Sequence, residues 1–488
     1  MNRRQFLSAS CGAGAGLCTS QAAAIVGHSL ATSPDTFAAL SVKSCGAAGD
    51  GRTDDTEAIQ RALDQGPGAI LLPPGSYRLS RTVTVDLYRG YRAVRGEAGT
   101  ARVIMTGPGP AFRIIGNHQG TANPSTVKPH VWDAERMPVL TGFEILGAHE
   151  QADGIELVQT MQTVLHDLLI RRCRFGLHLV VRNRNVVISG CHVYQCADTG
   201  IFLDQVDLHQ ANIFGNHVSY NRRAGIRQLN GDVHNVQIVG NDIEYNSGSD
   251  ESSGEILLEV PDGTASEFTI AANTIQATLP APGANLRIAG KPADGPLGVR
   301  LIAVTGNVLG SRCLNIDLAC GERITLSGNT VYGASALGVR LTRCRSVAIG
   351  SNTFVSSTLD GKTARDGLLL EHCLGCSIVG NVIGGGGAAG DESAASLRLH
   401  RCRDINVSSC QFLDPIYCGI ALEDSIRCML SDNTIVDRRP VKTMQTAVRV
   451  TGQSRDNLIL NNALYRGTRA AIDCPKEMAT LSNNTIWD

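Results

Sequence analysis

The stretch Ile238–Ile243 reads IVGNDI, and it belongs to a series of six-residue phrases that decides the fold. Each phrase has an apolar residue, two mostly small residues, usually Asn, any residue, and a second apolar residue. The copies begin at residues 188, 213, 238, 270, 304, 326, 349, 378, 407, 430, 459 and 481, at intervals of 22 to 34 residues. A repeat of this length is typical of a solenoid of stacked coils.

The fourth position of the phrase is Asn in ten of the twelve copies. Asn tolerates a left-handed backbone and forms turns, so it marks a corner of each coil. When coils stack in register, such side chains can form a hydrogen-bonded ladder. We therefore expect a parallel β-helix from about Ser41 to Asp488 in which eight residues stack at one corner: Asn216, Asn241, Asn273, Asn307, Asn329, Asn352, Asn381 and Asn433.

A second phrase in each coil alternates apolar and variable residues, as in GIELV from Gly154 and TGIFLD from Thr199. Alternation indicates a strand with one buried and one solvent-facing side. The residues predicted to point inward are Ile155, Leu177, Ile201, Ile226, Ile256, Val339, Leu368, Leu397, Ile420 and Val448. The residues between them form an outward row, where a functional site is expected.

The outward row carries a mixture of acids, histidine, arginine and aromatic residues on neighbouring coils. Its first positions are Glu156, His178, Phe202, Arg227 and Leu257, followed by Asn315, Arg340, Leu369, Arg398, Ala421 and Arg449. Its second positions are Val158, Val180, Asp204, Leu229 and Glu259. Because coils are about 4.8 Å apart, side chains on adjacent coils can reach one sugar ring. The alternative is an ordinary solvated sheet face with scattered charge.

The net charge and the cysteine spacing argue against nucleic acid and zinc as partners. The formal net charge is -1, which gives no basic surface for nucleic acid. Of the 16 cysteines, 14 follow residue 24, and Cys344, Cys373 and Cys402 occupy equivalent places before the Asn phrase. They are interpreted as buried packing residues in a stack. Cys373 and Cys376 form a C-x-x-C pair, but no second pair or His cluster completes a zinc site.

The first residues read MNRRQFLSAS, and an apolar stretch follows that ends in Ala22–Ala24. Paired arginines before Phe and Leu resemble a twin-arginine export signal with an Ala-x-Ala cleavage site. The alternative is a chance Arg pair in an ordinary secretory signal. Residues 1–24 are therefore predicted to direct the protein to the periplasm or the medium, with residues 25–41 as a linker. No later segment has the roughly 20 apolar residues of a membrane span.

Residues Cys45–Leu63 read CGAAGDGRTDDTEAIQRAL, and Gly68–Ser80 read GAILLPPGSYRLS. Thr53–Thr56 provide a helix N-cap with acids in the first turn, and a short amphipathic helix with Ala58, Ile59 and Leu63 follows. A helix here can cover the open first coil of a β-helix. Capping explains the acids of this motif better than catalysis does.

This motif resembles the start of the pectate-lyase-like or rhamnogalacturonase/epimerase-like superfamily. The resemblance implies an all-β, right-handed single-stranded parallel β-helix with a short N-terminal capping helix. Residues 42–86 would form the cap and first coil, and residues 87–488 the remaining coils of the same domain. The superfamily acts mostly on polysaccharides and contains hydrolases, lyases, epimerases and phage tailspikes, so the motif specifies the fold more closely than the reaction.

A second group of polar residues lies between Phe202 and Arg227. Asp207 and His209 are two residues apart, so both project to one side of an extended chain. The segment distantly resembles the alginate C5-epimerases, which have Asp-Pro-His where this chain has Asp207-Leu208-His209. The acid that the family places in the next strand would fall near Leu229, with Asp204 or Asp232 as substitutes.

Removal of H5 from a uronic acid needs a general base and a cation that neutralises the carboxylate. The predicted catalytic residues are His209, Tyr220, Asp207 and Asp204. The predicted substrate-binding residues are Glu156, His178, Phe202, Arg222, Arg223, Arg227, Glu244 and Glu259. The centre of the groove is expected at His209, Tyr220 and Arg227. Reprotonation would give a C5-epimerase, and loss of the 4-linked sugar would give a lyase.

Two further functions stay open at this point. A glycoside hydrolase needs a carboxyl pair, which Asp204, Asp207, Asp242, Glu244, Glu255 and Glu259 could provide. A non-catalytic carbohydrate-binding solenoid, of the tailspike or adhesin kind, needs neither. The sequence predicts no cofactor and no metal ligands, with calcium left open. The predicted partner is a polysaccharide, without nucleic acid, and the protein is a monomer or a homotrimer.

Changing Arg3 and Arg4 together to Lys should leave the precursor in the cytoplasm, because a twin-arginine signal is read through the paired guanidinium groups. Immunoblots of cell fractions measure this outcome. Unchanged export of the double variant would contradict the twin-arginine assignment, while an Arg52→Lys variant serves as the control.

Overall fold

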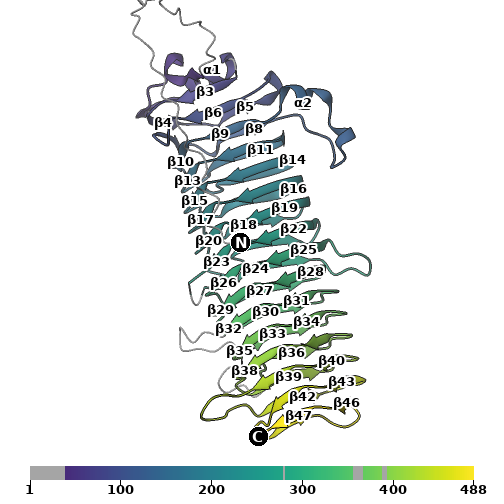
Figure 1. Ribbon diagram of the computed structural model, residues 1–488. Helices are drawn as coiled ribbons and strands as arrows, with labels where there is room; N and C mark the ends of the chain where they lie inside the picture. The colour runs from purple at the N-terminus through teal and green to yellow at the C-terminus, as the bar shows by residue number, and fades with distance from the viewer. Residues whose placement is uncertain (1–38, 67, 279–280, 356–365, 387–392) are drawn as a thin grey trace, which may run out of the picture. The chain divides into compact units, whose positions relative to one another are not determined.

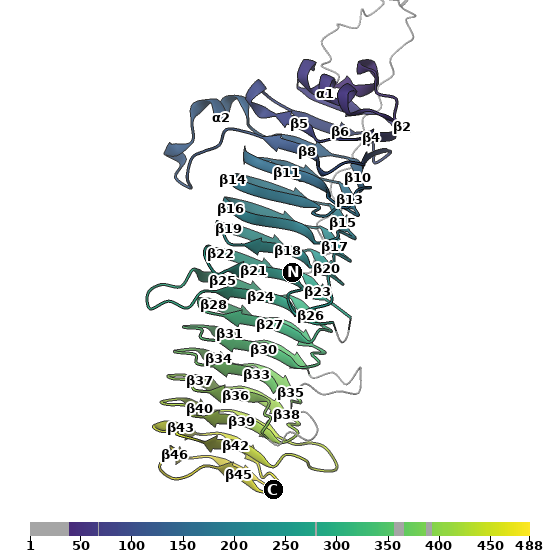
Figure 2. The same cartoon turned by 180° about the vertical axis from the view of Figure 1, so that it is seen from behind.

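The computed structural model describes residues 39–488 apart from 67, 279–280, 356–365 and 387–392, so the predicted signal and most of the linker lie outside the described residues. The described chain forms a parallel β-helix in which each coil pairs with the next (Figures 1 and 2). All pairings between the strands are parallel, and the register advances by one coil at a time, as in β18 (Ala224–Leu229) and β21 (Gly254–Val260). The predicted all-β parallel solenoid is confirmed.

Each coil contributes strands to three faces. The strands of the first face, in stacking order, are β5 (Val83–Asp86), β8 (Gly109–Ile115), β11 (Ala152–Met161), β14 (Leu177–Ser189), β16 (Thr199–Phe214), β18, β21, β24 (Ala284–Gly290), β27 (Leu314–Ala319), β30 (Leu337–Thr342), β33 (Asp366–Glu371), β36 (Leu397–His400), β39 (Cys418–Glu423), β42 (Thr446–Thr451) and β45 (Ala470–Asp473).

The long strands β14 and β16 continue around a corner onto the second face. The other strands of that face are β1 (Leu40–Ser41), β3 (Ala69–Leu72), β6 (Ala93–Gly96), β9 (Val139–Thr141), β12 (Val164–His166), β19 (Asp232–Val239), β22 (Thr264–Ala271), β25 (Val299–Thr305), β28 (Gly321–Ser327), β31 (Ala348–Gly350), β34 (Ser377–Val379), β37 (Asn406–Ser408), β40 (Met429–Ser431), β43 (Asn457–Leu460) and β46 (Ala479–Ser482).

The third face is a separate sheet of mostly short strands. They are β2 (Asp50–Asp54), β4 (Gly75–Leu79), β7 (Ala101–Met105), β10 (Phe143–Gly147), β13 (Leu169–Arg171), β15 (His192–Tyr194), β17 (His217–Ser219), β20 (Asp242–Glu244), β23 (Thr274–Gln276), β26 (Val308–Gly310), β29 (Thr330–Tyr332), β32 (Thr353–Val355), β35 (Val382–Gly384), β38 (Gln411–Leu413), β41 (Thr434–Val436), β44 (Ala463–Tyr465) and β47 (Thr485–Trp487).

The predicted asparagine ladder lies inside the corner between the second and third faces. Each of its side chains bridges to the next coil, as where Asn273 Nδ2 donates to Asn307 Oδ1 at 2.9 Å and Asn307 Nδ2 to Asn329 Oδ1 at 3.0 Å. All eight predicted ladder residues are buried. The ladder is interrupted at Cys410, whose backbone N–H donates to Asn433 Oδ1 at 3.0 Å, and then continues through Asn462. The corner polar groups are therefore satisfied internally.

The core is a stack of the inward residues. The ten residues predicted to point inward on the first face are all buried, with exposed fractions of at most 1%. Cys344, Cys373 and Cys402 are buried in one column, as predicted, and the 14 cysteines of the described chain are free thiols. Burial raises the pKa of Cys196 to about 12 and that of Cys428 to about 12. These thiols pack as small apolar residues.

The N-terminal end of the β-helix is covered by α1 (Thr56–Gln65), which buries Ala58, Ile59 and Leu63 as predicted. The N-cap residue is Asp55, within the predicted Thr53–Thr56, but its side chain makes no capping hydrogen bond. Asp54 accepts from Thr56 N–H at 3.1 Å, while Asp55 turns back to accept from Ala48 N–H at 2.6 Å. Hydrogen bonds from Ser80 and Thr56 hold the pKa of Asp54 down at about 2, against the opposing effect of burial. The other helices are η1 (Val42–Cys45), η2 (Leu87–Arg89), η3 (Pro124–Thr126) and α2 (Pro129–Ala134).

Asn315, expected in the outward row, and Glu255, a candidate carboxyl for a hydrolase, are both buried. Asn315 pairs in register with Gly338, so Asp317 rather than Asn315 occupies the outward row, and Asn315 accepts a hydrogen bond from Asn285 at 2.8 Å. Glu255 is also buried, 2.8 Å from Arg312 Nη1, and burial raises its pKa to about 8. The prediction of Asn315 as an outward residue and of Glu255 as a catalytic carboxyl is therefore wrong, because both follow the strand's first residue at the inward corner.

Asn307→Ala should lower the free energy of unfolding by about 3 kcal/mol or more. The change removes the acceptor of the buried Asn273 backbone N–H and the donor to the Ile270 carbonyl, and each unsatisfied buried group costs about 1–3 kcal/mol. Urea and thermal denaturation followed by circular dichroism measure the loss. Thr330→Ala, at an exposed outward position of β29, is the control and should change stability little; an equal effect of the two substitutions would contradict a stabilising ladder.

Candidate functional site

The corner between the first and second faces carries a group of charged residues. In β16, Gln205 and Gln210 adopt left-handed φ angles of 47° and 66°, and these bends set the four residues between them apart as a narrow facet. The same facet recurs in β14 and at the start of β19. Its outward side chains are Arg182 and Arg184, then Asp207 and His209, then Asp232 and His234, one pair on each of three successive coils.

A segment from an earlier coil covers this facet. Between β8 and β9 the chain leaves the coil at Gly116 and returns at Pro138, and Figures 1 and 2 both show α2 on the same side as β19 and β22. Arg184 Nη1 donates to the carbonyls of Thr121 at 2.7 Å and Ala122 at 2.9 Å. His118 belongs to this segment and is 2% exposed. We call the six facet residues together with His118 the corner site.

The corner site encloses a cavity of about 210 Å³, lined by His118, Arg182, Asp207, His209, Asp232 and His234, among others. Arg182 binds Asp207 at 2.5 Å, and His234 binds Asp232 at 2.8 Å through Nε2 and Ser266 Oγ at 2.5 Å through Nδ1. Ser266 is buried, so it holds the His234 ring in place and does not reach the cavity. The cavity thus presents acids, the Arg182 guanidinium group and imidazoles on adjacent coils about 4.8 Å apart.

The two unpaired imidazoles of the cavity are held neutral at pH 7. Burial, assisted by Arg184 and Arg182, lowers the pKa of His118 to about 4. Burial, then Arg184 and His234, also lowers the pKa of His209. The Nδ1 atoms of both rings are buried without a hydrogen-bond partner among the described residues. A neutral imidazole next to guanidinium groups can accept a proton from a bound acid derivative.

The structure separates the predicted site residues into three places. Asp207 and His209 are in the corner site. Glu156, His178, Phe202, Asp204, Arg227 and Glu259 lie on the first face, and Tyr220, Arg222, Arg223 and Glu244 lie on or beside the third. The six-residue strand β18 (Ala224–Leu229) spans about 20 Å and separates the corner that carries Tyr220 from the corner that carries His209. The predicted centre at His209, Tyr220 and Arg227 is therefore wrong, because these residues belong to different faces of the coil.

The outward row of the first face is engaged in contacts between coils. His178 lies 3.1 Å from Asp204 and is stacked on Phe202, with ring centroids 5.4 Å apart. Arg227 contacts the Phe202 ring and binds Glu259 at 2.9 Å. His178, Phe202 and Arg227 are each less than 9% exposed, so the row points outward as predicted but is largely covered by its own neighbours.

Tyr220 lies at the corner between the third and first faces, where it is exposed and stacked on Tyr245 at 5.6 Å. Arg222 and Arg223 line a separate cavity of about 420 Å³ with Asp198 and several serines. Burial, then the neighbouring Asp242, raises the pKa of Glu244. None of these groups lines the corner-site cavity.

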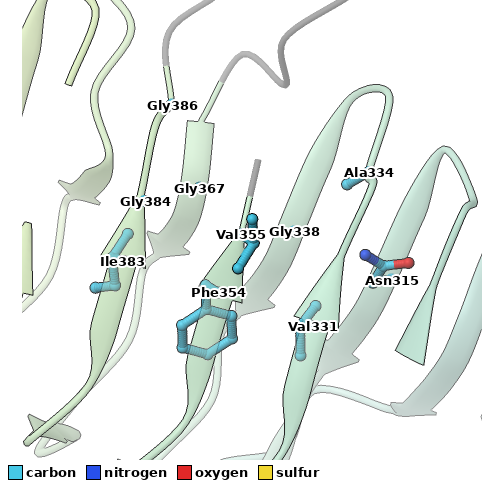
Figure 3. A pocket seen from close by; sticks show the side chains of 10 residues that line it. All are labelled: Asn315, Val331, Ala334, Gly338, Phe354, Val355, Gly367, Ile383, Gly384 and Gly386. Atoms are coloured by element: carbon cyan, nitrogen blue, oxygen red, sulfur yellow. The ribbon is translucent and has the colours of Figure 1, made fainter. Parts of the chain in front are cut away.

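A further cavity in the core, of about 20 Å³, lies at Val331, Phe354 and Ile383 on three successive strands (Figure 3). It is mostly apolar and close to the size of a single water molecule. It is a packing defect and not a ligand site.

Sequence reasoning missed His118, Arg182, Arg184 and His234 as site residues. Arg182-x-Arg184, Asp207-x-His209 and Asp232-x-His234 follow one another at 25-residue intervals, a signal that aligning successive Asn phrases would have exposed. The register also pairs Asp207 with Asp232, whereas Leu229 pairs with Asp204. Asp232, one of the two substitutes considered above, is therefore the acid that lies beside Asp207 on the next coil. His118 has no repeat signal, because it lies in the segment that interrupts the coils.

Comparison with known proteins assigns the chain to a family. A family model described as right-handed β-helix region matches residues 140–277 and 313–488. The chain belongs to the right-handed β-helix family. A second model, described as rhamnogalacturonase A/epimerase, pectate lyase-like, matches residues 39–107, which contain the capping motif. Both the predicted superfamily and the handedness are confirmed.

Individual relatives are distant or local. The chain is 56% identical over 43 residues to "Alginate lyase 7" of Azotobacter vinelandii, which is 8% of this chain and 5% of that protein. Similar solved structures include the A-module of mannuronan C-5 epimerase AlgE6 of the same organism, with 14% identity, TM-score 0.40 and coverage of 92% and 99% of the two chains. Another is tailspike protein 3 of bacteriophage CBA120, with 15% identity, TM-score 0.46 and coverage of 87% of this chain and 61% of that chain.

In the part of the chain that the structure describes, no three His, Cys, Asp or Glu side chains converge as a metal-binding group would require. No described helix has the length and apolarity to cross a membrane.

Arg184→Ala should release the segment 117–135 from the facet, because it removes both bonds to the Thr121 and Ala122 carbonyls. Hydrogen exchange measured by mass spectrometry should become at least several-fold faster in peptides from this segment, while the coils keep their protection. Arg172→Ala, at an exposed corner outside the site, is the matched control. Unchanged exchange in 117–135 would show that Arg184 does not anchor the segment.

Proposed function

We propose that this protein is a polysaccharide-active enzyme that removes the C5 proton of a uronic acid, with the corner site as its active site. The observation that carries the proposal is the neutral imidazole of His209, which lines a cavity together with the Arg182 guanidinium group and the carboxylates of Asp207 and Asp232. C5 of a uronic acid lies next to a carboxylate, so a base and a cation must act on neighbouring atoms. The corner site provides both within adjacent coils.

His209 is the proposed general base. Its depressed pKa keeps it unprotonated at neutral pH, and its ring lines the cavity in which the substrate would lie. Arg182 and Arg184 are proposed to stabilise the negative charge that develops on the uronate carboxylate as the proton leaves. His234, held by Asp232 and Ser266 on the next coil, is proposed to return or donate a proton. Tyr220 has no part in this proposal, since it lies at another corner.

Two reaction outcomes follow from the same first step. Return of a proton to the opposite side of C5 gives an epimer, and expulsion of the sugar at C4 gives an unsaturated lyase product. The short identity to an alginate lyase supports uronic acid chemistry in general and does not separate the two outcomes. The class of enzyme proposed is therefore a lyase or C5-epimerase acting on acidic glycans.

A glycoside hydrolase is the second candidate, because Asp207 and Asp232 lie on adjacent coils in direct register. Carboxyl groups about 5 Å apart suit a retaining mechanism. However, Asp207 accepts from Arg182, and Asp232 from His234 and Thr264, so both carboxylates act as hydrogen-bond acceptors. A hydrolase needs one of them as a proton donor, which makes proton abstraction the better-supported reaction.

His209→Ala should reduce turnover by about 10²-fold or more, the usual contribution of a general base. Purified protein would be incubated with uronate polysaccharides in D₂O. Deuterium at C5 reports proton abstraction, absorbance of unsaturated products reports elimination, and new reducing ends without either report hydrolysis. Because the pKa of His209 lies below its usual value of 6.5, the rate should fall with acid only below that pH.

The matched control is His192→Ala, which removes an exposed imidazole on the third face and should leave turnover unchanged. Circular dichroism would confirm that both variants fold. The proposal fails if active protein incorporates no deuterium and forms no unsaturated product, or if His209→Ala keeps full activity. New reducing ends alone would favour the hydrolase, with Asp207→Asn and Asp232→Asn as the next variants.

A further inference from the structure

A second groove adjoins the corner site on the same three coils. The strands that supply Arg182–Arg184, Asp207–His209 and Asp232–His234 run directly into it. The groove has a volume of about 310 Å³. Its lining residues are Asn185, Val186, Val187, Gln210, Asn212, Asn235 and Gln237. His209 and Asn212 are three residues apart on either side of the bend at Gln210, so their backbones are at most about 10 Å apart, a span of one to two pyranose rings.

The lining of this amide groove contains no charged side chain. Each amide offers both a donor and an acceptor, which matches the hydroxyl and N-acetyl groups of uncharged sugars. Asn185 Nδ2 already donates to Gln210 Oε1 at 2.6 Å, which fixes the orientation of these two groups. Within the described chain, the side chains of Asn212, Asn235 and Gln237 make no hydrogen bonds, so they are available to a ligand.

The amides coincide with the coils of the corner site. The bend position reads Asn185, Gln210 and Asn235, and on the next three coils it becomes Glu267, Leu301 and Arg323. The mid-strand position reads Asn212 and Gln237, and it then becomes Thr269, Ala303 and Thr325.

Backbone geometry explains only part of this pattern. Asn suits the left-handed φ of the bend, but Gln has no such advantage, and Asn is depleted in the middle of strands. The amides of Gln210 and Asn212 are therefore not accounted for by the fold.

The charges around the groove favour an uncharged ligand. Arg182 and Arg184 are confined to the facet, so a carboxylate in the amide groove would have no cation in its lining. Glu267, the next residue in the bend column, adds negative charge beyond Asn235. Burying an unpaired carboxylate near another is unfavourable, whereas a hydroxyl-bearing ring carries no such penalty. The half-buried Val187 adds a small apolar surface for the C–H face of a ring.

We propose that the amide groove binds an uncharged sugar next to the acidic sugar held at the corner site. The substrate is then a heteropolysaccharide in which acidic and neutral sugars adjoin, and not a homopolymer of uronic acid. This inference rests on the proposed function of the corner site and specifies its substrate class.

The experiment compares two kinds of probe. Hyaluronan oligosaccharides alternate a uronic acid with an N-acetylated neutral sugar, and polymannuronate oligosaccharides carry a carboxylate on every ring. Binding would be measured by calorimetric titration of the His209→Ala protein, and C5 deuterium incorporation would be measured with His209 intact. We expect the alternating probe to bind at least ten-fold more tightly and to exchange faster.

Two groove variants and one control make the comparison specific. Asn212→Ala with Gln237→Ala should remove most of the preference for the alternating probe. Asn212→Lys should reverse it, because the new cation can pair with a carboxylate. Asn406→Ala changes the same outward column several coils away, on β37, and should have no effect. Stability measurements on each variant separate binding effects from misfolding.

The outcomes distinguish this inference from the proposed function. If polymannuronate binds and exchanges as well as hyaluronan, and the groove variants bind like the unaltered protein, the amide groove is not a neutral-sugar subsite although the corner site is active. If neither probe incorporates deuterium at C5, the proposed corner-site chemistry is wrong for these sugars. The calorimetric titrations alone then decide whether the amide groove binds a neutral sugar. A preference for hyaluronan over polymannuronate that the groove variants abolish supports the neutral-sugar subsite. Equal binding of the two probes, or no binding of either, overturns it.

Discussion

The fixed spacing of about 4.8 Å between hydrogen-bonded coils is the constraint on which the rest of the structure depends. Once one coil is in register with the next, each side chain meets its equivalent above and below. The ladder through Asn273, Asn307 and Asn329 enforces that register from inside, since each amide satisfies both a neighbour's amide and backbone groups of other coils. Slippage by one residue would break these buried bonds along the corner.

The same constraint explains how a site can arise on a repetitive scaffold. Residues 25 positions apart, such as Asp207 and Asp232, become neighbours without any special packing of the core. The inward partners of these coils, including Val206 and Leu208, remain ordinary buried apolar residues. Charge can therefore be concentrated on three coils while the free energy of folding is supplied elsewhere. The covering segment around His118 adds the burial that a flat sheet lacks.

The fold could be predicted from the sequence because inward and outward residues obey a strict alternation. Ile201 and Ile226 were placed correctly from that rule alone, as was the ladder. The site was predicted only in part, since alternation gives no information about which corner a residue occupies. Tyr220 and His209 are close in sequence but lie on opposite sides of the first face. Asn315 shows the related limit, because it lies two residues before Asp317, at the corner where its amide turns inward.

The column of free cysteines affects how the chain responds to oxidants before and after it folds. Cys344 and Cys373 are one coil apart, a spacing that geometry would allow a disulfide to bridge, yet burial keeps these thiols out of contact with oxidants. An extended chain has no such burial, and the 14 thiols that follow residue 24 could pair in many incorrect combinations. Folding therefore also protects the thiols from oxidation. A chain that folds before it meets an oxidising environment forms no incorrect disulfides.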